Sequence, residues 1–287
     1  MNIDALFSHI DQEPESGVLY LVGTPIGNLY DISLRALNIL KKVTLIACED
    51  TRQTKKIMSK FEINNNLISF NMHNCEKKIP KIITSLKKGD SIALVSDAGM
   101  PSICDPGESL VQEAKFNKLN IICIPGPCAA ITALVSSGFH SSRFTFEGFL
   151  PKKKKEREKI LSNISKNEKS TILYESPHRI NNLLIELRNY CGGNREIQLF
   201  RELTKKFEEN IGNNVDEVIE KINSKKVLGE ITLIIKGLND SKNNQFDLLF
   251  LKRELNELIN AGLSVSAASK YLAKKNGLSK NIIYNLN

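Results

Sequence analysis

Short apolar runs alternate with amphipathic stretches through the first part of the chain, and each run stops at a polar loop. A short continuous apolar run is typical of a strand buried on both faces of a parallel sheet. Such runs predict strands at 18–22, 43–47, 67–68, 92–95 and 120–124. Apolar residues at helical spacing predict helices at 31–40, 54–61, 79–86 and 108–116. Asp31 or Ser33 is placed to cap the first helix. This alternation favours an open, mostly parallel α/β sheet.

A second alternation begins near Phe144, after a stretch of small residues at 128–137 that predicts a well-buried helix. Its expected strands lie at 144–150, 170–174, 196–200 and 229–236. Its expected helices lie at 152–165, between Arg179 and Tyr190, and at 215–222. The chain is therefore expected to hold a loose N-terminus at 1–16 and two α/β subdomains, at 17–126 and 127–239.

The last part of the chain, residues 246–287 after a polar linker at 240–245, has a different pattern. The spacing of apolar residues predicts an amphipathic helix at 246–261. It also predicts a second helix at 265–275, with Ser264 as its cap. A turn at 276–278 and a cap at Ser279 precede a last short helix. Two helices joined by a short turn with a glycine have the proportions of a DNA-binding helix-turn-helix motif. Short helical hairpins that serve only for packing have the same sequence pattern.

The chain has 287 residues, a net charge of +8 and a pI near 9.1. This charge favours an anionic partner, with nucleic acid first, although a chain this rich in Lys, Asn and Ile can reflect a biased genome. Six scattered cysteines without a C-x-x-C pair exclude the usual zinc spacings and suggest a reducing compartment. With these spacings missing, no metal is expected. No apolar run approaches the ~20 residues of a membrane span, so the cytoplasm is the expected location.

The polar loops after the predicted strands are the candidates for chemistry. The loop at 23–27 has neither of the common phosphate-binding glycine spacings, and the chain has no G-x-S-x-G or H-E-x-x-H pattern. The loop after the strand at 92–95 brings Asp97, Gly99 and, further on, Asp105. Gly99 permits close backbone approach and the two carboxylates accept hydrogen bonds, although an ordinary strand-to-helix connection fits equally. Loops at the carboxyl ends of parallel strands converge on one crevice.

Seven of these segments, in this order, resemble the tetrapyrrole (corrin/porphyrin) methylases, and among them the members that methylate the ribose of a cytidine in bacterial 16S rRNA. They are GTPIGNL at 23–29, EDTR at 49–52, SDAGMP at 96–101, PGPCAA at 125–130, EGFLP at 147–151, YESPHR at 174–179 and RELTK at 201–205. The resemblance runs from about Val18 to the end of the chain.

The resemblance implies a fold of two α/β subdomains with S-adenosylmethionine in the cleft between them, a small helical C-terminal tail and a homodimer. It implies cofactor contacts at Ser96, Asp97, Gly99, Met100, Pro101, Ser102, Pro125, Gly126, Ala129 and Tyr174. Two positions depart from the usual pattern. Met100 stands where Thr is common, and Cys104 where Ser or Asn is commoner. Neither departure removes a charged group.

The implied reaction is methylation of a ribose 2′-OH, a weak acid that benefits from a general base. Glu175, His178 and Glu49 are the first candidates, followed by Asp50, Glu202 and Lys205. Each has a structural alternative: Glu49 and Asp50 can cap the helix that follows them, Glu175 can hold Arg179, and a lone histidine is often structural.

The implied partner is 16S rRNA in the small ribosomal subunit. The side chains expected to contact RNA phosphate are Arg52, Lys152, Lys153, Lys154, Lys155, Arg179, Arg201 and Lys205. A solvated helix face is the alternative for the run at 152–155. Two rival functions remain, since fold does not fix substrate: a small-molecule methylase, against which the basic run and tail argue, and a non-enzymatic nucleic-acid-binding regulator, which leaves the strand-end loops without a purpose.

Overall fold

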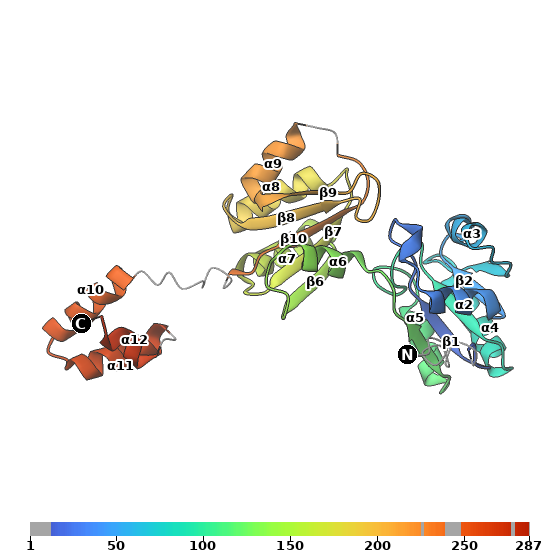
Figure 1. The fold of residues 1–287 in the computed structure, drawn as a ribbon, viewed down its shortest axis with the longest axis horizontal. Coiled ribbons are helices and arrows are strands. Elements are labelled where there is room, and N and C mark those ends of the chain that lie inside the picture. Colours follow the sequence, from blue (N-terminus) through green and yellow to red (C-terminus); the bar gives the residue numbers. More distant parts are fainter. Residues whose placement is uncertain (1–12, 225–226, 239–247, 277–278, 287) are drawn as a thin grey trace, which may run out of the picture. The chain divides into compact units, whose positions relative to one another are not determined.

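The computed structural model describes residues 13–224, 227–238, 248–276 and 279–286. The chain divides into two compact units, one up to Gly237 and the other from Leu238 onward. The first unit holds two sheets and the second holds helices (Figure 1). The linker expected at 240–245 and the turn residues 277–278 lie outside the described residues.

The first sheet is fully parallel, as the apolar runs predict. Its order is β3-β2-β4-β1-β5, with all neighbours parallel. The strands are β1 (Leu19–Val22), β2 (Leu45–Cys48), β3 (Leu67–Ser69), β4 (Ile92–Val95) and β5 (Ile121–Ile124). Because the strands run in one direction, their carboxyl ends and the loops that follow share one edge of the sheet.

Helices cover both faces of the first sheet. One core joins a face of the sheet to the 3₁₀ turn η1 (Leu29–Asp31), α2 (Leu34–Lys42) and α3 (Thr51–Lys60), and a second core joins the opposite face to α4 (Cys75–Lys87) and α5 (Glu108–Phe116). The Ser33 hydroxyl caps α2 by accepting the Ala36 N–H. α3 begins at Thr51, three residues earlier than its apolar spacing indicates, because Asp50 caps it.

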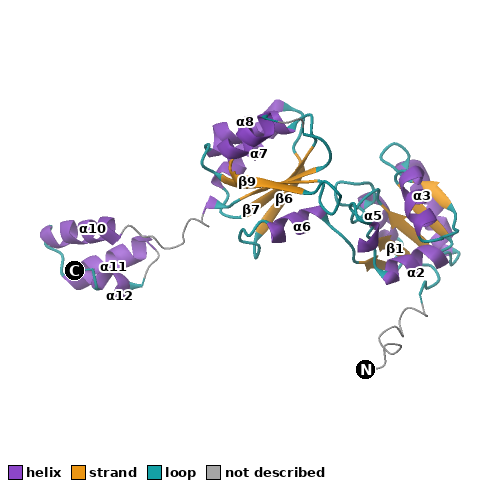
Figure 2. Cartoon of the chain, turned by 45° about the horizontal axis from the view of Figure 1, so that its top comes forward, coloured by secondary structure: helices purple, strands orange, loops and turns teal. Residues whose placement is uncertain are grey.

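The second sheet has the order β6-β7-β10-β8-β9. Its strands are β6 (Phe144–Phe149), β7 (Ser170–Glu175), β8 (Glu196–Arg201), β9 (Glu209–Asn214) and β10 (Ile231–Ile235). Figure 2 shows α7 (Lys154–Lys166) and α8 (Ile180–Cys191) on one face and α6 (Ala129–Ser136) on the other. α9 (Val215–Asn223) packs with α7 and α8.

The second sheet differs from the pattern-based expectation in two ways. Only β6 and β7 are parallel, whereas β10 is antiparallel to β7 and β8, and β8 to β9. The edge strand β9 was not predicted, because its sequence, Glu-Asn-Ile-Gly-Asn-Asn, buries only Ile211 and has no continuous apolar run. An edge strand pairs through its backbone and needs few apolar side chains.

Residues 13–16, at the end of the stretch expected to be loose, are held to the first sheet's subdomain; residues 1–12 of that stretch lie outside the described part. Glu13 is buried and forms an ion pair with Arg35. The Glu15 N–H donates to the Tyr20 hydroxyl at 2.8 Å, and the Ser16 hydroxyl donates to the Gly89 carbonyl at 2.8 Å.

The second unit is a small helical body. It contains α10 (Leu248–Asn260), α11 (Val265–Asn276) and α12 (Lys280–Tyr284), packed around a core that includes Leu255, Leu272 and Ile283. The Ser264 hydroxyl accepts the Ala267 N–H at 3.2 Å, so it caps α11. Among the described residues, no helix has the length and apolar character needed to cross a lipid bilayer.

Candidate active site

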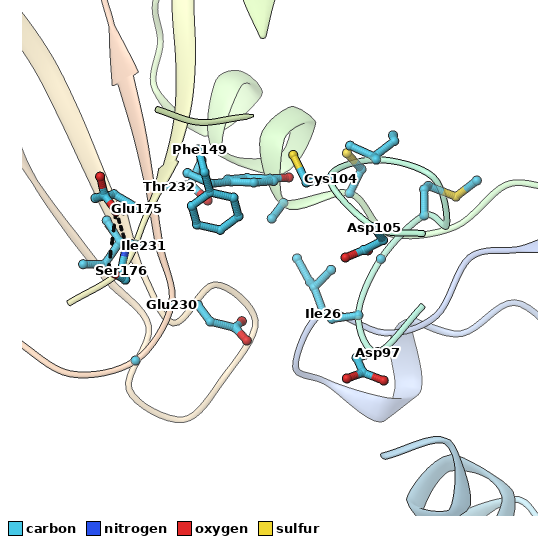
Figure 3. A pocket seen from close by; sticks show the side chains of 18 of the residues that line it. Ile26, Asp97, Cys104, Asp105, Phe149, Glu175, Ser176, Glu230, Ile231 and Thr232 are labelled. Atoms are coloured by element: carbon cyan, nitrogen blue, oxygen red, sulfur yellow. Dashed lines mark hydrogen bonds between the residues drawn. The ribbon is translucent and has the colours of Figure 1, made fainter. Parts of the chain in front are cut away.

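A cavity of about 420 Å³ lies in the first unit, where loops of the first sheet's carboxyl edge face strands of the second sheet. Figure 3 shows Ile26, Asp97, Cys104 and Asp105 on one side, with Phe149, Glu230, Ile231 and Thr232 on the other. Its volume falls within the roughly 300–1,000 Å³ of small-molecule and cofactor sites.

Backbone hydrogen bonds join the loops at the first sheet's edge. The Thr24 N–H donates to the Gly99 carbonyl at 2.9 Å, and the Gly99 N–H returns to the Thr24 carbonyl at 3.1 Å. Gly99 has φ +80°, and Ser102 and Cys104 also have positive φ, at 70° and 62°. Non-glycine residues at positive φ are uncommon and concentrate at ligand sites. The loop from β4 to α5 thus has a fixed shape that its neighbours impose.

Three carboxylates gather in the cavity wall, from Glu49, Asp97 and Asp105. Burial raises the pKa of all three, and Asp97 raises those of Glu49 and Asp105 further. For Asp105 the pKa reaches about 6, although contact with the Ser96 hydroxyl acts in the opposite direction. Like charges that share a low-dielectric wall favour either protonation or a cationic ligand.

Asp105 is expected to make stability depend on pH. Because its folded-state pKa is raised from 3.8 to about 6, its contribution is fully present below pH ~4 and is lost as pH rises through about 6. Allowing for partial exposure, we expect this contribution to be about 1–2 kcal/mol. Thermal unfolding between pH 4 and 7 should show it, and Asp105→Asn should flatten the profile; an unchanged profile in that variant would contradict this assignment.

Aromatic side chains form the wall opposite the carboxylates. Tyr174 lies edge-on to Phe146 with ring centroids 5.1 Å apart, and tilted to Phe149 at 5.7 Å. Its hydroxyl accepts the Ala130 N–H at 3.0 Å, which ties β7 to the start of α6. Burial raises the pKa of Tyr174, so the hydroxyl stays protonated. The wall that holds Tyr174 and Phe149 is therefore mainly apolar, with Glu230 at its edge, and the facing wall is anionic.

The cofactor residues expected from the sequence fall into two sets. Those that line the cavity are Asp97, Gly99, Met100, Ala129 and Tyr174. Those that lie in the same loops without lining it are Ser96, Pro101, Ser102, Pro125 and Gly126. Ser96 bonds the Ala98 and Gly99 carbonyls, each at 3.3 Å, and so shapes the loop. The role of both sets in cofactor binding stays a prediction.

The candidate bases have very different surroundings. The Glu175 side chain is fully buried, with Arg179 Nε 3.3 Å from its Oε1 and Arg157 Nη1 3.8 Å from its Oε2. Its Oε1 also accepts the Ser176 N–H at 2.8 Å. His178 is exposed and does not line the cavity. Glu49 is half-buried in the cavity wall, so of the three it is the best placed to accept a proton from a bound ligand.

The cations expected to contact RNA also differ from one another. Lys152 to Lys155 are exposed, and Arg52 is 88% exposed while it pairs with Asp50. The remaining three already serve internal contacts, Arg179 with Glu175, Arg201 with Glu209 at 3.2 Å, and Lys205 with Glu202 at 2.8 Å and Glu230 at 3.0 Å. For these three, RNA contact would compete with an ion pair.

Several cavity residues were not predicted as site residues. Glu230, Ile231 and Thr232 stand at the amino end of β10, which the antiparallel register places beside Glu175 and Tyr174 at the carboxyl end of β7. The expected site loops all follow the carboxyl ends of strands, whereas these three residues stand at an amino end. The Gly229-Glu230 pair before an apolar run was the one available signal.

This site fits a cofactor that is cationic at one end and carries a flat aromatic group. The carboxylates of Glu49, Asp97 and Asp105 suit a positive charge, and Tyr174, Phe149 and Ile231 offer an apolar surface. Within the described part of the chain, no group of three or more His, Cys, Asp or Glu side chains could hold a metal ion.

Comparison with known proteins agrees with this geometry. Residues 18–219 match the model of the tetrapyrrole (corrin/porphyrin) methylases. A relative from Bacillus subtilis, named ribosomal RNA small subunit methyltransferase I, is 41% identical over 93% of this chain and 91% of its own length. A relative of the same name from Vibrio cholerae is 43% identical over 93% of each chain.

Solved structures show the same fold at low sequence identity. A cobalt precorrin-4 methyltransferase aligns with a TM-score of 0.59 and 12% identity over 77% of this chain and 95% of its own. A uroporphyrin-III C-methyltransferase from Thermus thermophilus, complexed with S-adenosylhomocysteine, aligns with a TM-score of 0.56 and 15% identity over 76% of this chain and 96% of its own.

Proposed function

The chain belongs to the family of tetrapyrrole (corrin/porphyrin) methylases, and from this premise we propose that it 2′-O-methylates the ribose of a cytidine in 16S rRNA of the small ribosomal subunit. The observation that carries the proposal is the match, at about 40% identity, to rRNA small subunit methyltransferases over more than 90% of both chains. The match extends well beyond the catalytic fold that the small-molecule methylases share.

The cofactor is S-adenosylmethionine. When bound, it supplies a methyl group on a positively charged sulfur, which keeps the electron pair of the broken carbon–sulfur bond. Asp97 and Asp105 supply negative charge for its cationic groups, and Gly99, Met100 and Ala129 bring backbone to the cavity. Tyr174 and Phe149 exclude water from the apolar side. The chain's contribution is alignment in a partly dry site.

The exposed lysines and arginines bind the RNA. Lys152 to Lys155 are exposed where α7 begins, and Lys153 and Lys154 pair there only with exposed carboxylates of the same segment. Arg52 is exposed at the start of α3. Such contacts neutralise phosphates and position the strand without reading its sequence. The helical unit from Leu238 onward is a second RNA-binding candidate. Arg179, Arg201 and Lys205 would contribute only by exchanging an internal carboxylate for a phosphate.

We expect a homodimer in the cytoplasm, where small ribosomal subunits are the available substrate. Support for self-association comes from α6, on which Ile131 and Val135, one turn apart, are 44% and 68% exposed. Apolar side chains grouped in this way on a surface helix favour a protein contact. Sedimentation of the purified protein would measure the oligomeric state directly.

The test uses labelled S-adenosylmethionine with three acceptors: naked 16S rRNA, assembled small subunits and a porphyrinogen. We expect label in rRNA, at a nucleotide whose 3′ linkage resists alkali, because methylation of the 2′-OH removes the internal nucleophile. Label in alkali-cleavable RNA would place the methyl on a base and exclude the ribose. Label in the porphyrinogen alone would make the protein a small-molecule methylase, as the precorrin-4 and uroporphyrin-III methyltransferases are named.

A further inference from the structure

A second cavity, of about 520 Å³, lies beside the first. It stands over the carboxyl ends of β2, β3 and β4, where Cys48 pairs with Ser69 on one side and with Val95 on the other. The loops that follow these three strands therefore lie side by side. Glu49 and Asp97 line both cavities, so a ligand in one would be separated from a ligand in the other only by this shared wall.

Hydrogen bonds fix the wall formed by the start of α3. Asp50 Oδ1 accepts the Arg52 N–H at 2.8 Å, and Asp50 Oδ2 lies 2.6 Å from Arg52 Nη2. This pairing lowers the pKa of Asp50 to about 2. The Asp50 N–H donates to Asp97 Oδ1 at 2.9 Å. Asp50 is thus a permanently ionised structural anchor and a poor proton acceptor.

The wall formed by the loop after β3 is fixed in a similar way. The Asn71 N–H donates to Asn74 Oδ1 at 3.0 Å, and Asn71 Oδ1 accepts the His73 N–H at 3.1 Å. Asn74 and Lys78 then bind the end of β3, at the Ser69 hydroxyl (2.8 Å) and carbonyl (2.6 Å). These bonds occupy the asparagines and leave the side chains of Met72 and His73 exposed.

Two ionisable side chains of this cavity stay available for a ligand. Within the described residues, no hydrogen bond or ion pair engages the Glu49 carboxylate or the His73 imidazole. Beside them, the Arg52 side chain is exposed although its Nε and Nη2 bond Asp50, and Met72 is exposed as well. A ribonucleotide needs these partners: an acceptor for its hydroxyls, cations for its phosphate and a soft apolar contact for its base.

On the basis of the function proposed above, we propose that this second cavity receives the acceptor nucleotide, with its ribose against Glu49 and its phosphate near Arg52 and His73, and that Glu49 accepts the 2′-hydroxyl proton. As O2′ forms its bond to the methyl carbon, its proton passes to the Glu49 carboxylate. The shared wall puts the ribose next to the cofactor cavity, which in-line transfer requires.

The electrostatics of Glu49 agree with this role. Its pKa is raised by burial first, then by Asp105, Asp97 and Asp50. Asp97 and Asp105 come from the loop after β4, and Asp50 stands at the start of α3. The Arg52 guanidinium and the His73 imidazole line the second cavity beside Glu49. A carboxylate with increased proton affinity is a better general base at neutral pH than an ordinary surface one.

The test compares Glu49→Gln, Glu49→Asp and His73→Ala with Glu220→Gln, an exposed carboxylate on α9 that lines neither cavity. Calorimetry measures S-adenosylmethionine affinity. Binding of unmethylated small subunits is measured with S-adenosylhomocysteine present, so that no chemistry occurs. Single-turnover rates are then followed from pH 5.5 to 9, and thermal unfolding checks that every variant folds.

For Glu49→Gln we expect the single-turnover rate to fall by at least about 100-fold and to lose its rise with pH. The affinities for the small subunit and for the cofactor should stay within about threefold of those of the unmodified protein. Glu49→Asp should recover part of the rate. His73→Ala should weaken subunit binding about tenfold at unchanged cofactor affinity, since it removes one phosphate contact. Glu220→Gln should behave as the unmodified protein.

Two different failures can be told apart. If the unmodified protein makes no 2′-O-methyl product, the proposed function fails. If it makes this product but Glu49→Gln keeps more than a tenth of the rate, Glu49 is not the proton acceptor. Normal subunit affinity of His73→Ala would likewise show that the nucleotide binds elsewhere.

Discussion

Replacement of Gly126 by valine is expected to reduce S-adenosylmethionine affinity by about 10- to 100-fold, because overpacking of about 1–3 kcal/mol would fall on the cofactor loops. Gly126 follows β5, and its backbone touches that of Gly23, which follows β1. A Cβ on Gly126 would lie 2.8 Å from the Gly23 Cα and 3.0 Å from the Gly23 carbonyl carbon. Neither backbone atom can move without displacing a strand end.

The effect should reach the cofactor because Gly23 and Gly126 support the loops that face it. A Cβ on Gly23 would lie 2.7 Å from the Gly126 Cα and 2.7 Å from the Met100 sulfur, and Met100 lines the cavity. Thr24, the next residue, is bonded to Gly99 in both directions. A shift at Gly126 therefore passes to Met100 and Gly99 through direct contacts.

Calorimetric titration of the valine variant measures this loss. Gly138→Ala is the matched control, since Gly138 also follows an element end but a Cβ there meets no atom within 4 Å. Because Gly138 has φ +70°, the control should lose about 1 kcal/mol of stability and keep its cofactor affinity. Wild-type affinity in a folded Gly126→Val protein would mean that the cofactor does not depend on this loop.

Replacement of Glu175 by leucine is expected to lower the free energy of unfolding by about 3 kcal/mol, the usual cost of removing one partner from a buried ion pair. The Glu175 side chain is fully buried between Arg157 and Arg179, and Arg157 is itself only 8% exposed. Arg157 keeps Glu186 as a second partner, with Nη2 2.6 Å from its carboxylate. Arg179 keeps a bond to the Leu150 carbonyl at 2.7 Å.

Chemical denaturation measures this change, with Glu158→Gln as the control. Glu158 belongs to an exposed pair with Lys154, 3.9 Å apart on α7, so its removal should change stability by less than about 0.5 kcal/mol. A double variant, Glu175→Leu with Arg157→Met, should recover part of the loss. If instead Glu175→Gln keeps full stability but loses the chemical step and its pH dependence, Glu175 is the proton acceptor.

The sequence by itself determined the elements of the first sheet and the place of the polar loop that follows β4. Apolar runs at 92–95 and 18–22 correspond to β4 and β1, and Ser33 caps α2 as its position indicates. It also determined the family, because loop segments such as Ser96 to Pro101 resemble those of the tetrapyrrole methylases, whose model matches residues 18–219. Parallel strands that are buried on both faces read as continuous apolar runs, so the strands of the first sheet are clear in the sequence.

Strand direction in the second sheet was decided only by the tertiary structure. Apolar alternation in β10 is the same whether its neighbours run parallel or antiparallel, so the sequence could not place Glu230 to Thr232 beside Tyr174. The polar edge strand β9 was missed for a related reason, since its pairing depends on backbone bonds to β8.

The tertiary structure alone also determined which charged side chains lie next to one another. Arg157 follows the basic run at 152–155 by two residues in the sequence, yet it is buried against Glu175 and Glu186, 18 and 29 residues further along the chain. Glu49 and Asp105 come from different loops and share one wall only because β2 and β4 are neighbours. Burial and proximity set whether a carboxylate is a structural anchor or a proton acceptor, and both arise from packing between segments that the sequence keeps apart.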